Sequence, residues 1–77
     1  MLPWIARAAR DARIAAGRKQ VHVAASADVD QSTVHRFESA IAWPRDIDRM
    51  VAAYADDLDI PAVELWRRAV DAWGARP

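Results

Sequence analysis

The sequence contains no cysteine and few histidines or glycines, and each shortage excludes a class of site. Without thiols the 77-residue chain can form neither a disulfide nor a thiolate metal centre, and His22 and His35 are too few for a zinc site of their own. Gly17 and Gly74 are the only glycines, so a glycine-rich phosphate-binding loop is excluded. We therefore expect no metal ion and no cofactor, and stability must come from side-chain packing.

Long apolar runs and a net charge are also missing. No segment approaches the roughly 20 apolar residues that span a bilayer, and residues 1–3 do not resemble a signal peptide, so we expect a cytoplasmic protein with no membrane contact. The 11 basic and 11 acidic side chains cancel. Residues 1–45 nevertheless carry seven basic against four acidic residues, a balance of +3, and residues 46–77 carry four against seven, a balance of −3. Affinity for a polyanion is therefore expected in the first half of the chain, and it should be modest.

The chain is instead rich in apolar residues, which make up 53% of it and include four tryptophans. Their recurrence at helical spacing predicts an all-α fold of five helices, and residues 1–77 have room for a single domain with a small core. The first helix should begin at Pro3 or Trp4 and end at Gly17. Its buried stripe is expected to consist of Ile5, Ala8, Ala9, Ala12 and Ala16.

The last two helices are predicted after a break at residues 39–43. Pro44 restarts the helical pattern, with Asp46 and Asp48 in a first turn that favours negative charge, and this helix runs to about Leu58. The fifth helix is expected from Pro61 to about Trp73. Three acidic residues at the end of the fourth helix and just after it should face solvent: Asp56, Asp57 and Asp59.

The stretch from Lys19 to Glu38, KQVHVAASADVDQSTVHRFE, predicts two short helices joined by a tight turn. The second helix should run from about Gln31 to Glu38, with Val34 and Phe37 on its buried side.

The turn and the helix crossing depend on three small or acidic residues. Ala24 is small enough to let the two helices cross at close distance. Asp28 stands where such turns usually have glycine, and aspartate tolerates the left-handed conformation better than most residues. The carboxylate of Asp30 is expected to cap the second helix by accepting from its free amide groups.

This segment resembles the helix-turn-helix of the Cro and repressor family of phage regulators, also called the xenobiotic-response-element family. The resemblance extends over roughly residues 4–65. It is carried by Gln20, Ala24, the run Gln31-Ser32-Thr33-Val34 and the run Arg36-Phe37-Glu38. It implies a repressor-like DNA-binding domain in which the second helix of the motif enters the major groove of a duplex.

Within this arrangement Gln31, Ser32 and Arg36 are the expected base-reading residues. Gln31 and Ser32 occupy the first turn of the second motif helix, and Arg36 lies one turn beyond Ser32 on the side opposite the buried residues. Glutamine can bond adenine through N6 and N7, and arginine can bond guanine O6 and N7 with two parallel hydrogen bonds. The alternative is that all three are ordinary surface residues.

Six further residues are expected to meet phosphate groups and so to set the register of the protein on DNA. They are Lys19, Gln20, Thr33, Arg45, Arg18 and Arg10. The resemblance also implies that Gln20 steadies the side chains of the recognition helix. Arg18 falls where the family usually buries a leucine, so its alternative is to lay its aliphatic stem on the core.

The resemblance further implies that Arg13 pairs with Glu38, and we expect this ion pair to be structural and not a DNA contact. The histidines are expected to be surface residues, because no serine, cysteine or paired carboxylate is spaced to use them. The aspartates also lack the alternating pattern and terminal glutamate of a calcium loop. We therefore expect no enzyme.

These features predict a phage or bacterial transcriptional regulator, a Cro-like repressor or switch protein, that binds a specific double-stranded DNA operator. Two alternatives stay open. One is an antitoxin-type autoregulator. The other is a protein-interaction module that kept the fold but lost DNA affinity, which the zero net charge favours.

The predicted fifth helix carries a stripe of Trp66, Val70 and Trp73. Core burial is expected for Trp66, whereas Val70 and Trp73 are candidates for a dimer surface. Such a patch is small beside the ~800 Å² per partner of a standard interface. We therefore expect a monomer or a weak homodimer in solution, with pairing favoured when DNA holds two copies side by side.

Overall fold

The computed structural model describes residues 1–41 and 43–75, and within these ranges the chain forms five α-helices and no strand. The predicted all-α class is therefore confirmed. The helices are α1 (Leu2–Ala15), α2 (Gln20–Ala27), α3 (Gln31–Glu38), α4 (Ile47–Leu58) and α5 (Ala62–Gly74). Among the described residues, none of these helices combines the length and the apolar character that crossing a membrane requires.

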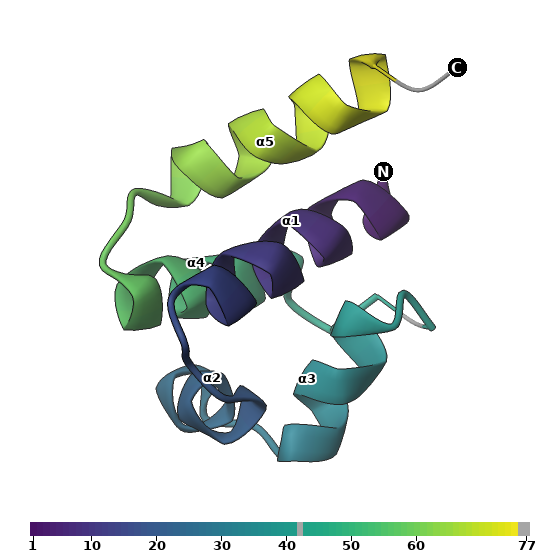
Figure 1. Ribbon diagram of the computed structural model, residues 1–77. Helices are drawn as coiled ribbons and strands as arrows, with labels where there is room; N and C mark the ends of the chain where they lie inside the picture. The colour runs from purple at the N-terminus through teal and green to yellow at the C-terminus, as the bar shows by residue number, and fades with distance from the viewer. Residues whose placement is uncertain (42, 76–77) are drawn as a thin grey trace.

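The helices are arranged in two halves (Figure 1). In one half α1 and α5 lie side by side, and in the other half α2 and α3 follow one another at a steep angle. Helix α4 packs against α1, α2 and α5 and so joins the two halves. Helix α1 also contacts α3.

The core receives large side chains from every helix. The largest fully buried residues are Tyr54, Phe37, Ile5, Leu65, Val23, Val34 and Val51. The rings of Phe37 and Tyr54 lie 5.7 Å apart with their planes inclined by 59°, a favourable tilted arrangement that ties α3 to α4. Trp66 is half-buried and packs against this core, as expected.

The buried side of α1 differs in part from the predicted stripe. Ile5, Ala9 and Ala12 are buried as expected, and Ala8 is half-buried at the edge of the core. The prediction for Ala16 was wrong, because α1 ends at Ala15 and leaves Ala16 exposed, and Ala6 is buried instead. Gly17 follows with φ +70°, so it supplies the left-handed residue after the helix that the sequence predicted.

The start of α4 was also misplaced. Pro44 lies before the helix, which begins at Ile47, because Asp46 takes the N-cap position and its carboxylate accepts from the Arg49 amide at 3.1 Å. Asp48 lies in the first turn, as predicted. The end at Leu58 agrees with the prediction, and α5 begins at Ala62, one residue later than expected.

Candidate nucleic-acid interface

Helices α2 and α3 meet at a turn built on Asp28. Asp28 adopts the left-handed conformation with φ 57° and ψ 48°, as the sequence predicted. The amide of Val29 then bonds back to the Ala24 carbonyl at 3.0 Å, which closes the end of α2. Ala24 itself is buried, so its small side chain allows α2 to pack closely. The chain enters α3 two residues later.

Asp30 occupies the N-cap position of α3, but its carboxylate makes no capping hydrogen bond, so that part of the prediction was wrong. The Thr33 amide instead bonds to the Asp30 backbone carbonyl at 3.0 Å. Asp30 and Asp28 are both exposed. They place two negative charges beside the start of α3.

Helix α3 has a buried side and an exposed side. Val34 and Phe37 are buried, with relative exposures of 0% and 1%. Because helical neighbours recur every 3.6 residues, the opposite side projects away from the core. Its exposed residues are Gln31, Ser32, His35 and Arg36. The three predicted base-reading residues are therefore brought together on one accessible side.

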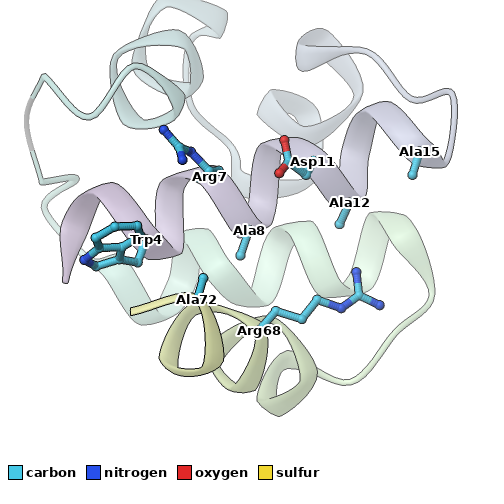
Figure 2. A pocket seen from close by; sticks show the side chains of 8 residues that line it. All are labelled: Trp4, Arg7, Ala8, Asp11, Ala12, Ala15, Arg68 and Ala72. Atoms are coloured by element: carbon cyan, nitrogen blue, oxygen red, sulfur yellow. The ribbon is translucent and has the colours of Figure 1, made fainter. Parts of the chain in front are cut away.

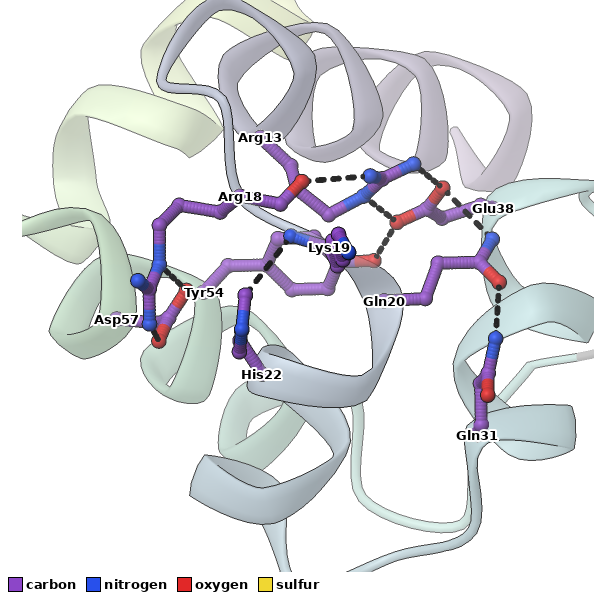
Figure 3. Close-up of polar contacts among 9 residues, drawn as sticks. All are labelled: Arg13, Arg18, Lys19, Gln20, His22, Gln31, Glu38, Tyr54 and Asp57. Carbon is purple, nitrogen blue, oxygen red and sulfur yellow. Dashed lines mark hydrogen bonds and ion pairs between the residues drawn. The ribbon is translucent and has the colours of Figure 1, made fainter.

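Glu38, the last residue of α3, is held by side chains from three other helices. Arg13 of α1 donates from Nε to Oε2 at 2.7 Å and from Nη2 to Oε1 at 2.8 Å, which is the expected ion pair with two parallel bonds. Gln20 of α2 donates to Oε1 at 3.2 Å. The hydroxyl of Tyr54, from α4, donates to Oε2 (Figure 3). One carboxylate thus joins α1, α2 and α4 to α3.

The burial of this carboxylate makes its partners necessary. Only 3% of the Glu38 side chain is accessible, and burial by itself opposes ionisation. The hydrogen bonds from Arg13, Tyr54 and Gln20 outweigh burial and lower the pKa of Glu38 below its ordinary value of 4.5. Burial and the bond to Glu38 raise the pKa of Tyr54 far above its ordinary value, so its hydroxyl stays protonated as a donor.

Gln20 extends this network to the exposed side of α3. Its side-chain nitrogen donates to Glu38, and its side-chain oxygen accepts from Gln31 Nε2 at 3.5 Å, a long hydrogen bond (Figure 3). A predicted base-reading residue is therefore oriented from behind by a residue of α2. The steadying role that the resemblance implies for Gln20 stays a prediction, and the contact with Gln31 is the observation that favours it.

Two hollows border the exposed side of α3. The first is lined by Arg10, Arg13, Ile14, Gln20, His35, Glu38 and Ser39. It brings Arg10 of α1 next to the middle of α3. The second is lined by Thr33, Arg36, Trp43, Pro44 and Arg45. It brings Thr33 and Arg45 next to Arg36. Four of the six residues predicted to meet phosphates therefore gather at these two flanks: Arg10, Gln20, Thr33 and Arg45.

Arg18 is not brought to this region. Its guanidinium group donates to both carboxylate oxygens of Asp57, at 3.1 and 2.8 Å, on the side of the molecule away from Gln31 (Figure 3). The prediction that Asp57 faces solvent was wrong, since only 6% of its side chain is accessible. Hydrogen bonding to Arg18 lowers the pKa of Asp57. This ion pair connects the α1–α2 loop with α4, so Arg18 has a structural role.

The start of α2 is capped by a residue that the sequence gave no role. The Lys19 amide donates to His22 Nδ1 at 3.0 Å, so His22 acts as a cap residue. The Lys19 side chain is exposed at this helix start. Lys19 therefore stays a candidate for a phosphate contact, with its backbone fixed.

The far side of the molecule carries a second accessible feature. Trp4, Ala8, Ala12, Ala72 and Arg68 border a groove of about 330 Å³ between α1 and α5 (Figure 2). Val70 and Trp73 on α5 are 50% and 43% exposed, so the predicted dimer surface is accessible.

Sequence reasoning missed the Tyr54 hydroxyl and the Arg18–Asp57 pair. Tyr54 was predicted only from its place on an apolar helix side, and a hydroxyl on a core position is the signal that could have suggested a buried polar partner. Within residues 1–41 and 43–75 no three histidine, aspartate or glutamate side chains converge as metal ligands do. Comparisons with protein families, curated proteins and solved structures find no match to this chain.

Proposed function

We propose that this protein is a sequence-specific regulator that binds double-stranded DNA through the exposed side of α3. The observation that carries the proposal is the way in which α3 is held. Helices of eight residues are unstable alone, yet this one is fixed at its end by Arg13, Gln20 and Tyr54 through Glu38. Rigid support behind an accessible polar helix side is what base recognition requires.

The dimensions and the chemistry of α3 agree with this role. An α-helix with its side chains is about 10–12 Å in diameter, which fits the roughly 12 Å width of the major groove. Arg36 offers a planar pair of donors to guanine, and Gln31 offers a donor and an acceptor to adenine. Because Gln31 is contacted by Gln20, less side-chain freedom is lost when it binds a base.

The charges around α3 favour binding of a polyanion with modest affinity. Arg10, Lys19, Arg36 and Arg45 are exposed at or beside the two motif helices, and none of them forms an ion pair within the described ranges. If all four meet phosphates, log K should fall with log salt at a slope of roughly −3 to −4. The exposed aspartates of the α2–α3 turn oppose this attraction.

A titration at two salt concentrations tests the proposal. Fluorescence anisotropy of a labelled duplex pool at about 50 and 200 mM salt should show an affinity that falls about a hundredfold. Arg45→Ala should make the slope shallower by about one, whereas Arg7→Ala, whose side chain borders the α1–α5 groove, is the matched control and should leave it unchanged. Absence of binding at the lower salt concentration would contradict the proposal.

A second candidate function is a protein-interaction module on the same fold. The observation that favours it is the apolar side of α5, where Val63, Val70 and Trp73 are 70%, 50% and 43% exposed. This second function predicts that the protein binds no duplex at low salt. The same titration therefore separates the two functions.

A further inference from the structure

We propose that Trp43 is a further DNA-contacting residue, which packs its indole ring against the sugar-phosphate strand that borders the groove entered by α3. This inference rests on the proposed function and adds to it an apolar backbone contact. The DNA contacts proposed above are all polar or charged. Trp43 lies immediately beside them but belongs to the segment between α3 and α4.

The end of α3 turns the chain so that Trp43 returns to the helix. Ala40 adopts the left-handed conformation with φ 55°, although alanine pays a steric cost there that glycine avoids. The amides of Ala40 and Ile41 bond to the Phe37 and Arg36 carbonyls, each at 3.0 Å. The chain then returns to the flank of α3, where Trp43 shares a hollow of about 170 Å³ with α3 residues. Strained backbone of this kind persists where the surrounding structure or a function requires it.

The exposure of Trp43 sets it apart from the tryptophans that serve the core. Trp4 and Trp66 are half-buried and pack against the buried cluster, whereas Trp43 is 51% exposed and does not belong to it. Pro44 follows directly, and a proline restricts the backbone of the residue before it. Because the backbone of Trp43 is already restricted, less entropy is lost when its ring is covered.

The charges around Trp43 identify an anionic strand as the occupant. Arg36 and Arg45 line the same hollow, and no carboxylate lines it. Neither guanidinium group forms an ion pair within the described ranges. A deoxyribose presents apolar C–H groups between two phosphates, so its sugar can lie on the indole while the phosphates meet the arginines.

The hollow is also continuous with the proposed base-reading side. Arg36 belongs to both, and Thr33, a predicted phosphate contact, lies one turn before it on α3. When α3 lies in a major groove, the DNA strand at the edge of that groove is the surface nearest to Trp43. This strand offers both apolar sugars and anionic phosphates. The contact should raise affinity for every sequence equally, because sugars and phosphates do not differ between base pairs.

The test compares Trp43→Ala with Trp73→Ala, a matched control of similar exposure on α5. Both are measured on a duplex with a single half-site, where pairing of two copies through α5 plays no part. On a duplex that the wild-type protein binds, Trp43→Ala should weaken binding about tenfold and leave the salt slope and the base preference unchanged. Trp43→Phe should stay within about threefold of wild type, and Trp73→Ala should bind as wild type does. Urea unfolding of each variant shows that the fold is retained.

A spectroscopic arm observes the contact without relying on affinity. In the full chain labelled with 5-fluorotryptophan, the ¹⁹F resonance of Trp43, assigned with Trp43→Phe, should shift when the duplex is added, while that of Trp66 should not. Wild-type binding with unchanged affinity in Trp43→Ala and an unshifted resonance would overturn this inference and leave the proposed function standing. A wild-type protein that binds no duplex would overturn both, and Trp43-dependent binding of a poly-glutamate peptide in preference to the duplex would show a protein-docking surface instead.

Discussion

The hydroxyl group of Tyr54 offers the sharpest test of how α3 is held in place. Tyr54→Phe removes one oxygen atom from a fully buried ring and leaves the ring itself to fill the same space. The change therefore creates almost no cavity, and the loss can be assigned to one hydrogen bond. That bond is donated to the ionised Glu38, which keeps Arg13 and Gln20 as partners.

The expected loss follows from the charge of the acceptor. Hydrogen bonds to charged groups contribute about 1.5–3 kcal/mol, so the free energy of unfolding at pH 7 should fall by about that amount. In a domain of this size, the melting temperature should fall by roughly 10 °C. Urea unfolding followed by circular dichroism measures the first quantity, and an unchanged m-value would show that the two states keep their compactness.

A double-mutant cycle with Glu38→Gln identifies the partner. If the hydroxyl acts through the carboxylate, Tyr54→Phe should cost much less in the Glu38→Gln background than in the wild-type protein. A loss below about 0.5 kcal/mol for Tyr54→Phe alone, or equal losses in the two backgrounds, would refute the reasoning. Arg13→Ala should cost more than Tyr54→Phe, about 3–5 kcal/mol, because it leaves the buried carboxylate without its countercharge.

Three further predictions concern stability and assembly. Because its folded-state pKa is lowered, Glu38 contributes stability above its ordinary pKa of 4.5 that is lost as pH falls through the folded value; urea unfolding from pH 7 to pH 3 should show this fall, reduced in Glu38→Gln. Ala40→Gly relieves the left-handed alanine and should raise the free energy of unfolding by about 1 kcal/mol, and a lower stability would contradict the assigned strain. Sedimentation at micromolar concentration should show a monomer or weak dimer that pairs on a duplex with two half-sites; a tight DNA-free dimer, undisturbed by Trp73→Ala, would mean that the interface lies elsewhere.

The segment of the fold that the sequence predicted best is the pair α2 and α3. The bounds of α3 agree with the prediction because Val34 and Phe37 are large and point to one side only. Alanine gives no such signal, since it is tolerated in a core and at the surface alike. For this reason the sequence prediction placed Ala16 on the buried side of α1, where the structure has Ala6.

Other features depended on contacts that no local pattern contains. The start of α4 is decided by competition between Pro44 and the capping carboxylate of Asp46, and both are reasonable starts by local rules. Arg18 and Asp57 are 39 residues apart, so their pairing follows from the packing of the α1–α2 loop near α4. The Arg13–Glu38 pair could be predicted only from the resemblance, because no spacing rule connects two residues that are 25 positions apart.

The central claim is that the exposed side of α3 reads base pairs, and selection from random duplexes followed by sequencing tests it most directly. The wild-type protein should enrich a defined site. Arg36→Ala should bind that site about 1–3 kcal/mol more weakly and lose its preference at one base pair, expected to be a guanine, while the other positions keep theirs. No enriched site with the wild-type protein, or the same site and affinity with Arg36→Ala, would contradict the account.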